Sequence, residues 1–216
     1  MEQIKLILVD PKPSLCSAWH NHFSTFPDVE IVNGYFEKLP EFDCMVSAAN
    51  SFGLMDGGVD LAIVRFFGRS LEKRVQAHIL ESYLGEQPLG TSFIIKTEHE
   101  KHHFIAHTPT MRLPMTIALT DNVYNAMWAM LLAVYQHNRK QDEKIRTIAC
   151  PGLGTATGQV PFDEAARQMA AAYQHFIKPP NHISWRYADE RQKAIGRGGD
   201  LGFMLSLKMS KLKNFD

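Results

Sequence analysis

Residues 44–60 decide the fold of this chain, and they read Cys-Met-Val-Ser-Ala-Ala-Asn-Ser-Phe-Gly-Leu-Met-Asp-Gly-Gly-Val-Asp. The small and apolar run from Cys44 to Ala49 predicts a buried strand. The stretch from Asn50 to Gly58 is rich in glycine and predicts a loop, and Val59 to Phe67 predicts a short helix. A strand that leads through a glycine-rich loop into a helix is typical of a ligand-facing site.

The same pattern returns near residue 150. Ile145 to Cys150 predicts a strand, Pro151 to Gly158 is a second glycine-rich loop, and Pro161 suits the first turn of a following helix. In open α/β sheets, ligands bind outside the carboxyl ends of the strands. We therefore expect the two loops to share one cleft.

Strands and helices alternate along the rest of the chain. Further strands are predicted at Ile4–Val9, Ile31–Val32, Phe93–Ile95 and Phe104–Ala106, the last of them ended by Thr108-Pro109-Thr110. Further helices are predicted at Ser14–Phe26, Leu71–Tyr83, Asp121–Arg139 and Phe162–Phe176, with Ser14 as the cap of the first. This order predicts a three-layer α/β/α domain with a mixed, mostly parallel central sheet.

The chain has 216 residues, which favours one large domain with an appendage over two equal domains. We assign residues 1–180 to the domain. Residues 181–216 form a C-terminal extension in which the regular pattern weakens after Pro179-Pro180, and this extension is expected either to pack as an extra helix or to be partly disordered.

The balance of charges limits the classes of partner. Lys plus Arg and Asp plus Glu both number 23, so we expect neither nucleic acid nor a membrane surface as a partner. The three cysteines, Cys16, Cys44 and Cys150, form no CxxC pair, which favours a reducing, cytoplasmic location over a disulfide framework. No stretch of about 18 apolar residues predicts a membrane span.

Both glycine-rich loops can hold an anion without a cationic side chain. Glycine leaves the backbone N–H groups unobstructed, so a loop can curl around a phosphate and donate several hydrogen bonds. The second loop lacks the lysine of GxxxxGK[ST], and its glycines do not fit GxGxxG, which disfavours a nucleoside triphosphatase and a dinucleotide dehydrogenase. No cofactor is predicted.

Four histidines invite a metal assignment, but none of their spacings is that of a conventional zinc site. His99, His102 and His103 lie on a polar segment and are predicted to be solvated. His107, at a strand end, is the best candidate among them for a place in the pocket. No metal site is predicted.

Three stretches together resemble the macro domain family. Val46-Ser-Ala-Ala-Asn50 followed by Gly57-Gly-Val-Asp60 resembles the family signature, usually V-N-A-A-N, a short spacer and G-G-G-V-D. His107-Thr108 resembles the family's H-T, and Pro151 to Pro161 resembles its second loop. The resemblance covers roughly residues 31–176.

The resemblance implies a pocket for ADP-ribose. In macro domains the first loop wraps the distal ribose and the second cradles the pyrophosphate with main-chain amides. It implies that Asn50 contacts the ribose hydroxyls and that Asp60 orients or activates a water in hydrolytic members, which act on ADP-ribosyl or O-acetyl-ADP-ribose esters. The other implied binding residues are Tyr35, Ala49, Gly57, Gly58, Val59, Gly152, Leu153, Gly154, Thr155, Ala156, Thr157 and Gly158.

The chain departs from the family pattern at several positions. Tyr35 stands where many members have the aspartate that contacts the adenine amino group, so either Tyr35 stacks on the base or Glu37 makes the polar contact. Val64 stands where hydrolytic relatives commonly have a histidine before the helix arginine. Asp56 interrupts the glycine string and adds a negative charge near the expected pyrophosphate.

Three functions follow as hypotheses. The first is an ADP-ribose-handling hydrolase that uses a water directed by Asp60. The second is a non-catalytic module that binds ADP-ribose, free or on an ADP-ribosylated protein. In the third, Tyr35 and Asp56 adapt the pocket to another nucleotide or sugar phosphate. The structural alternative is that Asn50 and Asp60 are ordinary loop and helix-start residues.

Overall fold

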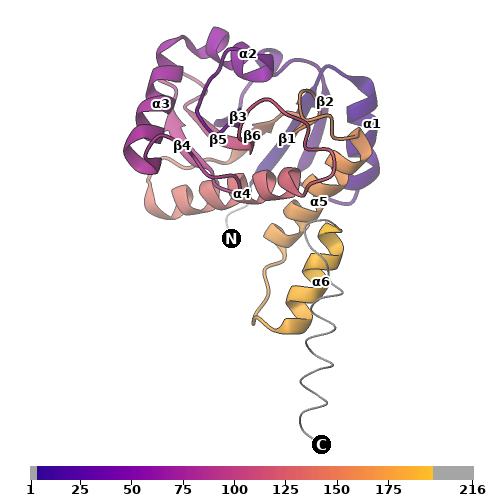
Figure 1. The fold of residues 1–216 in the computed structure, drawn as a ribbon. Helices are drawn as coiled ribbons and strands as arrows, with labels where there is room; N and C mark the ends of the chain where they lie inside the picture. Colours follow the sequence, from indigo (N-terminus) through magenta and orange to yellow (C-terminus); the bar gives the residue numbers. More distant parts are fainter. Residues whose placement is uncertain (1–3, 197–216) are drawn as a thin grey trace, which may run out of the picture.

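The computed structural model describes residues 4–196 and contains one six-stranded sheet. Its strands lie in the order β2-β1-β6-β3-β5-β4, and every neighbouring pair is parallel except β4 with β5 (Figure 1). The strands are β1 Lys5–Asp10, β2 Val29–Asn33, β3 Cys44–Asn50, β4 Phe93–Lys96, β5 Phe104–Met111 and β6 Thr147–Cys150. The sheet is mixed and mostly parallel, as predicted.

Helices cover both faces of the sheet. They are α1 Pro13–Phe23, α2 Gly58–Phe67, α3 Ser70–Tyr83, α4 Asn122–Lys140, α5 Phe162–Ile177 and α6 Trp185–Ile195, with a 3₁₀ turn, η1, at Phe36–Lys38. Alternate residues of a strand point to opposite faces. Leu6 and Leu8 accordingly pack with α1, α4 and α5, whereas Ile7 and Val9 pack with α2 and α3. The predicted three-layer α/β/α fold is confirmed.

The first helix begins differently from the prediction. Pro13 is its first residue, and Lys12 occupies the N-cap without a side-chain hydrogen bond, so Ser14 is not the cap. The fixed φ of proline suits a first helical position, where its missing N–H costs no hydrogen bond. The helix also ends at Phe23 and not at Phe26.

Strand β5 is longer than predicted. It continues through Pro109 to Met111, whereas the sequence pattern ended it at Thr108-Pro109-Thr110. The partner strand shifts its register here, so that Ala49 pairs with Pro109 but Asn50 pairs with Met111. Such an irregularity lets a proline, which has no N–H, lie within a sheet.

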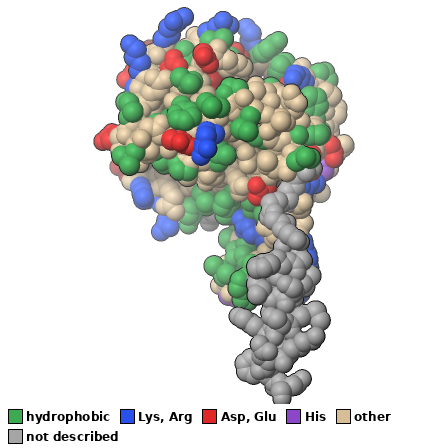
Figure 2. Space-filling view, in the orientation of Figure 1, with side chains coloured by type: hydrophobic (Ala, Val, Ile, Leu, Met, Phe, Trp, Pro, Cys, Tyr) green, Lys and Arg blue, Asp and Glu red, His purple; other side chains and the backbone are tan. Residues whose placement is uncertain are grey.

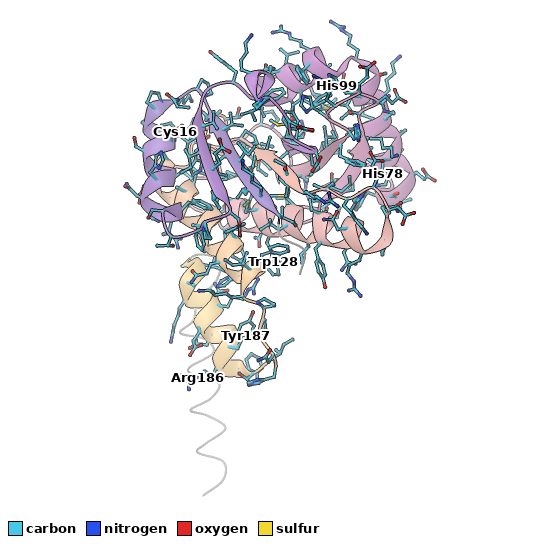
Figure 3. The ribbon with its side chains drawn as sticks, turned by 180° about the vertical axis from the view of Figure 1, so that it is seen from behind. Cys16, His78, His99, Trp128, Arg186 and Tyr187 are labelled. Carbon is cyan, nitrogen blue, oxygen red and sulfur yellow. The ribbon has the colours of Figure 1, made fainter. Side chains whose placement is uncertain are left out.

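Helix α6 lies outside the three layers and is joined to the end of α5 by residues 178–184 (Figure 1). Arg167 of α5 donates hydrogen bonds to the carbonyls of Ala194 and Ile195, and the guanidinium of Arg191 lies 4.2 Å from the centre of the Trp128 ring. Figure 3 shows Trp128 at this junction. Residues 197–216 of the predicted extension lie outside the described residues, and the domain boundary at residue 180 stays a prediction.

The surface has no concentrated basic face in the view of Figure 2, where Lys and Arg side chains are scattered among Asp and Glu. This distribution agrees with the equal numbers of acidic and basic residues. Among residues 4–196, no helix is both long and apolar enough to cross a membrane.

Candidate functional site

A cavity of about 430 Å³ opens at the carboxyl ends of β1, β3 and β5. Both glycine-rich loops contribute to its wall, and so do Phe36 and Glu37 of η1. It is lined by the predicted site residues Tyr35, Ala49, Asn50, Gly57, Gly58, Val59, Asp60, Gly152, Gly154, Thr155, Ala156, Thr157 and Gly158. The structure therefore brings together two segments that are about 100 residues apart in the sequence.

Leu153 is the one predicted site residue that does not line the cavity. Its side chain is fully buried in the core beneath α4 and α5. An apolar side chain between two glycines gains free energy by turning inward, away from the polar mouth of the loop. Leu153 therefore anchors the second loop to the core through its side chain, and the predicted contact of Leu153 with a ligand, which would involve its backbone, stays a prediction.

Asn50 organises the first loop from within. Its Oδ1 accepts hydrogen bonds from the backbone N–H groups of Phe52 and Leu54, and its Nδ2 donates to the Leu54 carbonyl at 2.7 Å. These bonds make Asn50 a turn-forming residue, as in the structural alternative. Its amide oxygen is thus occupied, while Nδ2 retains a second hydrogen that these bonds do not use.

Asp60 lies in the first turn of α2 and lines the cavity, although only 6% of the residue is exposed. Its Oδ1 accepts a 2.7 Å hydrogen bond from the hydroxyl of Ser47. Burial raises the pKa of Asp60 to about 6; the bond from Ser47 opposes this shift, and Glu72 adds to it. A carboxylate with a pKa near neutrality is a better proton acceptor than an ordinary aspartate.

The second loop is tightly folded against its surroundings. A Cβ at Gly158 would lie 2.5 Å from the Gly154 carbonyl oxygen, and a Cβ at Gly152 would lie 2.5 Å from a methyl group of Leu15. Gly154 has a φ of +68°, in the region that favours glycine. The glycines thus permit a compact backbone whose amides border the cavity.

Charged side chains in the cavity are mostly acidic. Of the described residues that line it, Lys12 is the only lysine or arginine, whereas Asp10, Glu37, Asp56 and Asp60 are acidic. Any anion held here must therefore rely mainly on backbone N–H groups. The Lys12 backbone itself donates to the Asp10 carboxylate at 2.9 Å.

The wall formed by η1 combines an exposed ring with an unsatisfied carboxylate. Tyr35 is 62% exposed at the cavity mouth. Glu37 lines the same part of the cavity, and its Oε2 is buried without a hydrogen-bond partner in the described chain. A buried polar atom without a partner costs free energy, so this oxygen would gain from a hydrogen bond donated by a ligand.

Two histidines lie in other surroundings than the sequence pattern predicts. His107 is fully buried beside Phe93 and does not line the cavity; its Nδ1 lies 2.6 Å from the Gln87 side-chain oxygen, and burial lowers its pKa to about 3. His102 is also buried and not solvated, because its ring stacks on Phe42 and its Nδ1 bonds to the Phe42 carbonyl.

Several lining residues were not predicted. Asp10 ends β1, Thr110 and Met111 end β5, and Pro114 follows them. The rule that ligands bind at the carboxyl ends of parallel strands could have found the first three, since β1 is parallel to both of its neighbours and β5 is parallel to β3. Leu54, within the first loop, also lines the cavity with 46% of its surface exposed.

Comparisons with known proteins agree on one family. The family model described as Macro domain matches residues 46–169. An uncharacterized protein of Aquifex aeolicus is 30% identical over 151 residues, which cover 69% of this chain and 82% of that protein. Another, from Fusobacterium nucleatum, is 28% identical over 155 residues, covering 71% of this chain and 82% of its own length.

Solved structures share the fold. The Oceanobacillus iheyensis macrodomain with ADP has a TM-score of 0.57 and 23% identity, over 76% of this chain and 87% of that one. A mutant of the same macrodomain with ADPR has a TM-score of 0.58 and 22% identity, over 90% and 94%. The macrodomain of Mycobacterium tuberculosis DarG has a TM-score of 0.53 and 19% identity, over 66% and 87%.

Proposed function

Because the chain belongs to the macro domain family, we propose that it binds ADP-ribose in the cavity between its two glycine-rich loops. The observation that carries this proposal is that thirteen of the fourteen implied site residues line one cavity. Similar macrodomains have been solved with ADP and with ADPR, which are ligands of the same chemical class.

The second loop is proposed to hold the pyrophosphate. It occupies the middle of the cavity because it follows β6, which lies between β1 and β3 in the sheet. Its glycines permit backbone amides to approach an anion closely. On one side the β3 end, with Asn50 and Asp60, would take the distal ribose. On the other side the η1 wall, with Tyr35 and Glu37, would take the base.

We further propose that the protein hydrolyses an ADP-ribosyl or O-acetyl-ADP-ribose ester. The carboxylate of Asp60 would accept a proton from a water molecule while the water oxygen attacks the ester carbonyl carbon. Asp60 would then return this proton to the ribose oxygen as the bond between that oxygen and the carbonyl carbon breaks, so that the ribose regains its hydroxyl and the acyl group leaves as a carboxylic acid. With its pKa near 6, Asp60 is largely ionised at neutral pH yet basic enough to take a proton.

A non-catalytic ADP-ribose-binding module is the second candidate. Two observations favour it: Val64 replaces the histidine of hydrolytic relatives, and the Asn50 oxygen is already bonded within its own loop. Binding requires the backbone of the two loops but no proton acceptor. The two candidates therefore differ in turnover and agree in affinity.

Calorimetric titration with ADP-ribose, ADP, AMP, ribose phosphate and NAD, together with an assay for release of acetate from O-acetyl-ADP-ribose, separates the candidates. We expect ADP-ribose to bind most tightly, and a concentration of 100 times its Kd to add about 2.7 kcal/mol to stability. Acetate release supports the hydrolase, and tight binding without release supports the module. Preference for another ligand would support an altered pocket.

Glu37→Gln is expected to weaken ADP-ribose binding by about tenfold or more, because we propose that Glu37 accepts a hydrogen bond from the adenine amino group. The hypoxanthine analogue of ADP-ribose has a carbonyl in place of this amino group. Since glutamine can donate to a carbonyl, the variant should bind the analogue better than the wild type does. Both affinities are measured by calorimetry.

Glu41→Gln is the matched control, since Glu41 is exposed four residues away and does not line the cavity. It should bind both ligands as the wild type does. If Glu37→Gln leaves the ratio of the two affinities unchanged, Glu37 does not read the base, and Tyr35 becomes the residue to test by Tyr35→Ala.

A further inference from the structure

Ser47 is a buried residue with a single polar partner. It lies on β3 with none of its surface exposed, and its hydroxyl donates to Asp60 Oδ1 at 2.7 Å. Because Asp60 lies in the first turn of α2, this bond ties the start of the helix to the middle of the sheet. Ser47 itself does not line the cavity, so it meets no ligand there.

The bond distinguishes the two oxygens of the Asp60 carboxylate. Oδ1 is held by the Ser47 hydroxyl, whereas Oδ2 receives no hydrogen bond within residues 4–196. A carboxylate turns readily about its last bond, and one fixed hydrogen bond removes much of that freedom. Oδ2 is therefore the oxygen whose hydrogen-bonding capacity remains free for a water.

We propose that Ser47 is a positioning residue for the hydrolytic reaction: it holds Asp60 by Oδ1 and so presents Oδ2 to the attacking water. The inference rests on the proposed hydrolase function. It assigns a catalytic contribution to a side chain outside the cavity, which acts on substrate only through Asp60.

The groups around Asp60 give Ser47 a second effect. A hydrogen bond to the ionised carboxylate favours ionisation and so opposes the effect of burial. The neighbouring His107 of β5 pairs with Ser47 in the sheet, but it is neutral near pH 7 and bonded to Gln87, so it supplies no opposite charge. Glu72 of α3 acts on Asp60 as a like charge. The other charged groups that line the same cavity are Asp56 of the first loop, Glu37 of η1, Asp10 at the end of β1 and Lys12 at the N-cap of α1.

Glu72 cannot replace Ser47. Its carboxylate accepts a hydrogen bond from the Met55 backbone N–H at 3.0 Å and acts on Asp60 as a like charge. Removing the Ser47 hydroxyl should therefore leave the Asp60 carboxylate both less fixed and harder to ionise. These two losses predict a lower kcat. They also predict that the acid limb of the pH–rate profile, where activity is lost as Asp60 becomes protonated, lies at higher pH.

The test compares the pH dependence of acetate release from O-acetyl-ADP-ribose in the wild type, Ser47→Ala and Ser47→Thr. For Ser47→Ala we expect kcat at pH 7 to fall about tenfold and the acid limb to move up by about one pH unit. The KM and the Kd for ADP-ribose should stay within about twofold, because the cavity walls are unchanged. Ser47→Thr keeps the hydroxyl and should restore the acid limb.

Ser92→Ala serves as the control, since the Ser92 hydroxyl also bonds to a side chain, that of Thr108, while Ser92 neither lines the cavity nor bonds to Asp60. It should leave the pH profile unaltered. If Ser47→Ala does not fold, Ser47→Cys, which keeps the size and weakens the donor, takes its place. Turnover with an unchanged acid limb in the Ser47 variant overturns this inference alone. Absence of turnover in the wild type overturns the hydrolase proposal and this inference together.

Discussion

Asp60→Asn is expected to lower kcat for ester hydrolysis by about 10²- to 10⁴-fold while ADP-ribose still binds. Asparagine has nearly the same shape as aspartate and its oxygen can still accept the Ser47 hydrogen bond, but it cannot take a proton from water. Acetate release and calorimetric titration on the same preparation measure the two properties separately.

The same substitution is expected to stabilise the fold at pH 7. Below pH about 4, Asp60 is protonated in both the folded and the unfolded chain. Between pH about 4 and 6 the unfolded chain loses this proton while the folded chain keeps it, so the free energy of unfolding falls as pH rises. Above pH 6 the folded protein bears the net cost of keeping Asp60 ionised, about 3 kcal/mol.

His107 has the opposite effect over much of the same interval. Its pKa is lowered to about 3 in the folded protein, so the unfolded chain gains a proton first as pH falls below about 6.5, and stability is lost. The effects of Asp60 and His107 therefore oppose each other between pH about 4 and 6. Asp60→Asn removes the effect of Asp60 and leaves that of His107. The free energy of unfolding of this variant should therefore fall more steeply than that of the wild type as the pH is lowered from about 6 to 4.

Urea unfolding at pH 4, 5, 6 and 7 checks this result. The advantage of Asp60→Asn should be largest at pH 7 and vanish near pH 4. Undiminished hydrolysis by the variant would show that another group activates the water. A variant that is less stable than the wild type at pH 7 would show that the Asp60 carboxylate is not strained by its burial.

Gly57→Val and Gly158→Val are expected to separate ligand binding from folding. Gly57 lines the cavity, has an ordinary φ of −144°, and an added Cβ would meet no atom within 4 Å. A valine there should cost at most about 1 kcal/mol of stability, mainly through the N-cap of α2. Its methyl groups would occupy the space proposed for the ligand, so ADP-ribose affinity should fall by at least about tenfold.

Gly158→Val should instead destabilise the protein itself. The added Cβ would lie 2.5 Å from the Gly154 carbonyl oxygen and 2.8 Å from Ile117, and a backbone oxygen cannot move aside cheaply. Overpacking of this kind typically costs about 1–3 kcal/mol, and the displaced loop should bind ADP-ribose poorly as well. Urea unfolding and calorimetry are needed for both variants. Unchanged affinity in Gly57→Val would remove the first loop from the binding site.

Much of the fold was predictable because the local patterns and the tertiary structure agree. The helix from Ser70 to Tyr83 buries Leu71, Val75 and Ile79 at the predicted four-residue spacing. Both glycine-rich loops follow parallel strands, so a rule about strand ends was sufficient to bring Asn50 and Gly154 to one cavity. Each helix and each loop could be recognised from residues near one another in the sequence, and the general rule about strand ends supplied the contact between the two loops.

The errors concern contacts between distant residues. The stacking of His102 on Phe42 joins positions 60 residues apart, and nothing near His102 in the sequence indicates it. The continuation of β5 past Pro109 depends on a register shift in β3. Local patterns do not contain this information.

The scarcity of cations around the cavity has a consequence for how binding responds to ionic strength. The affinity of a site built from lysines and arginines falls as salt screens their charges. Hydrogen bonds from fixed backbone dipoles are screened far less at contact distance. With Lys12 as the only described basic side chain at the cavity, added sodium chloride should hardly lower the affinity for a diphosphate. It should instead relieve repulsion from the neighbouring carboxylates, so binding is expected to hold or to improve slightly as the buffer becomes more concentrated.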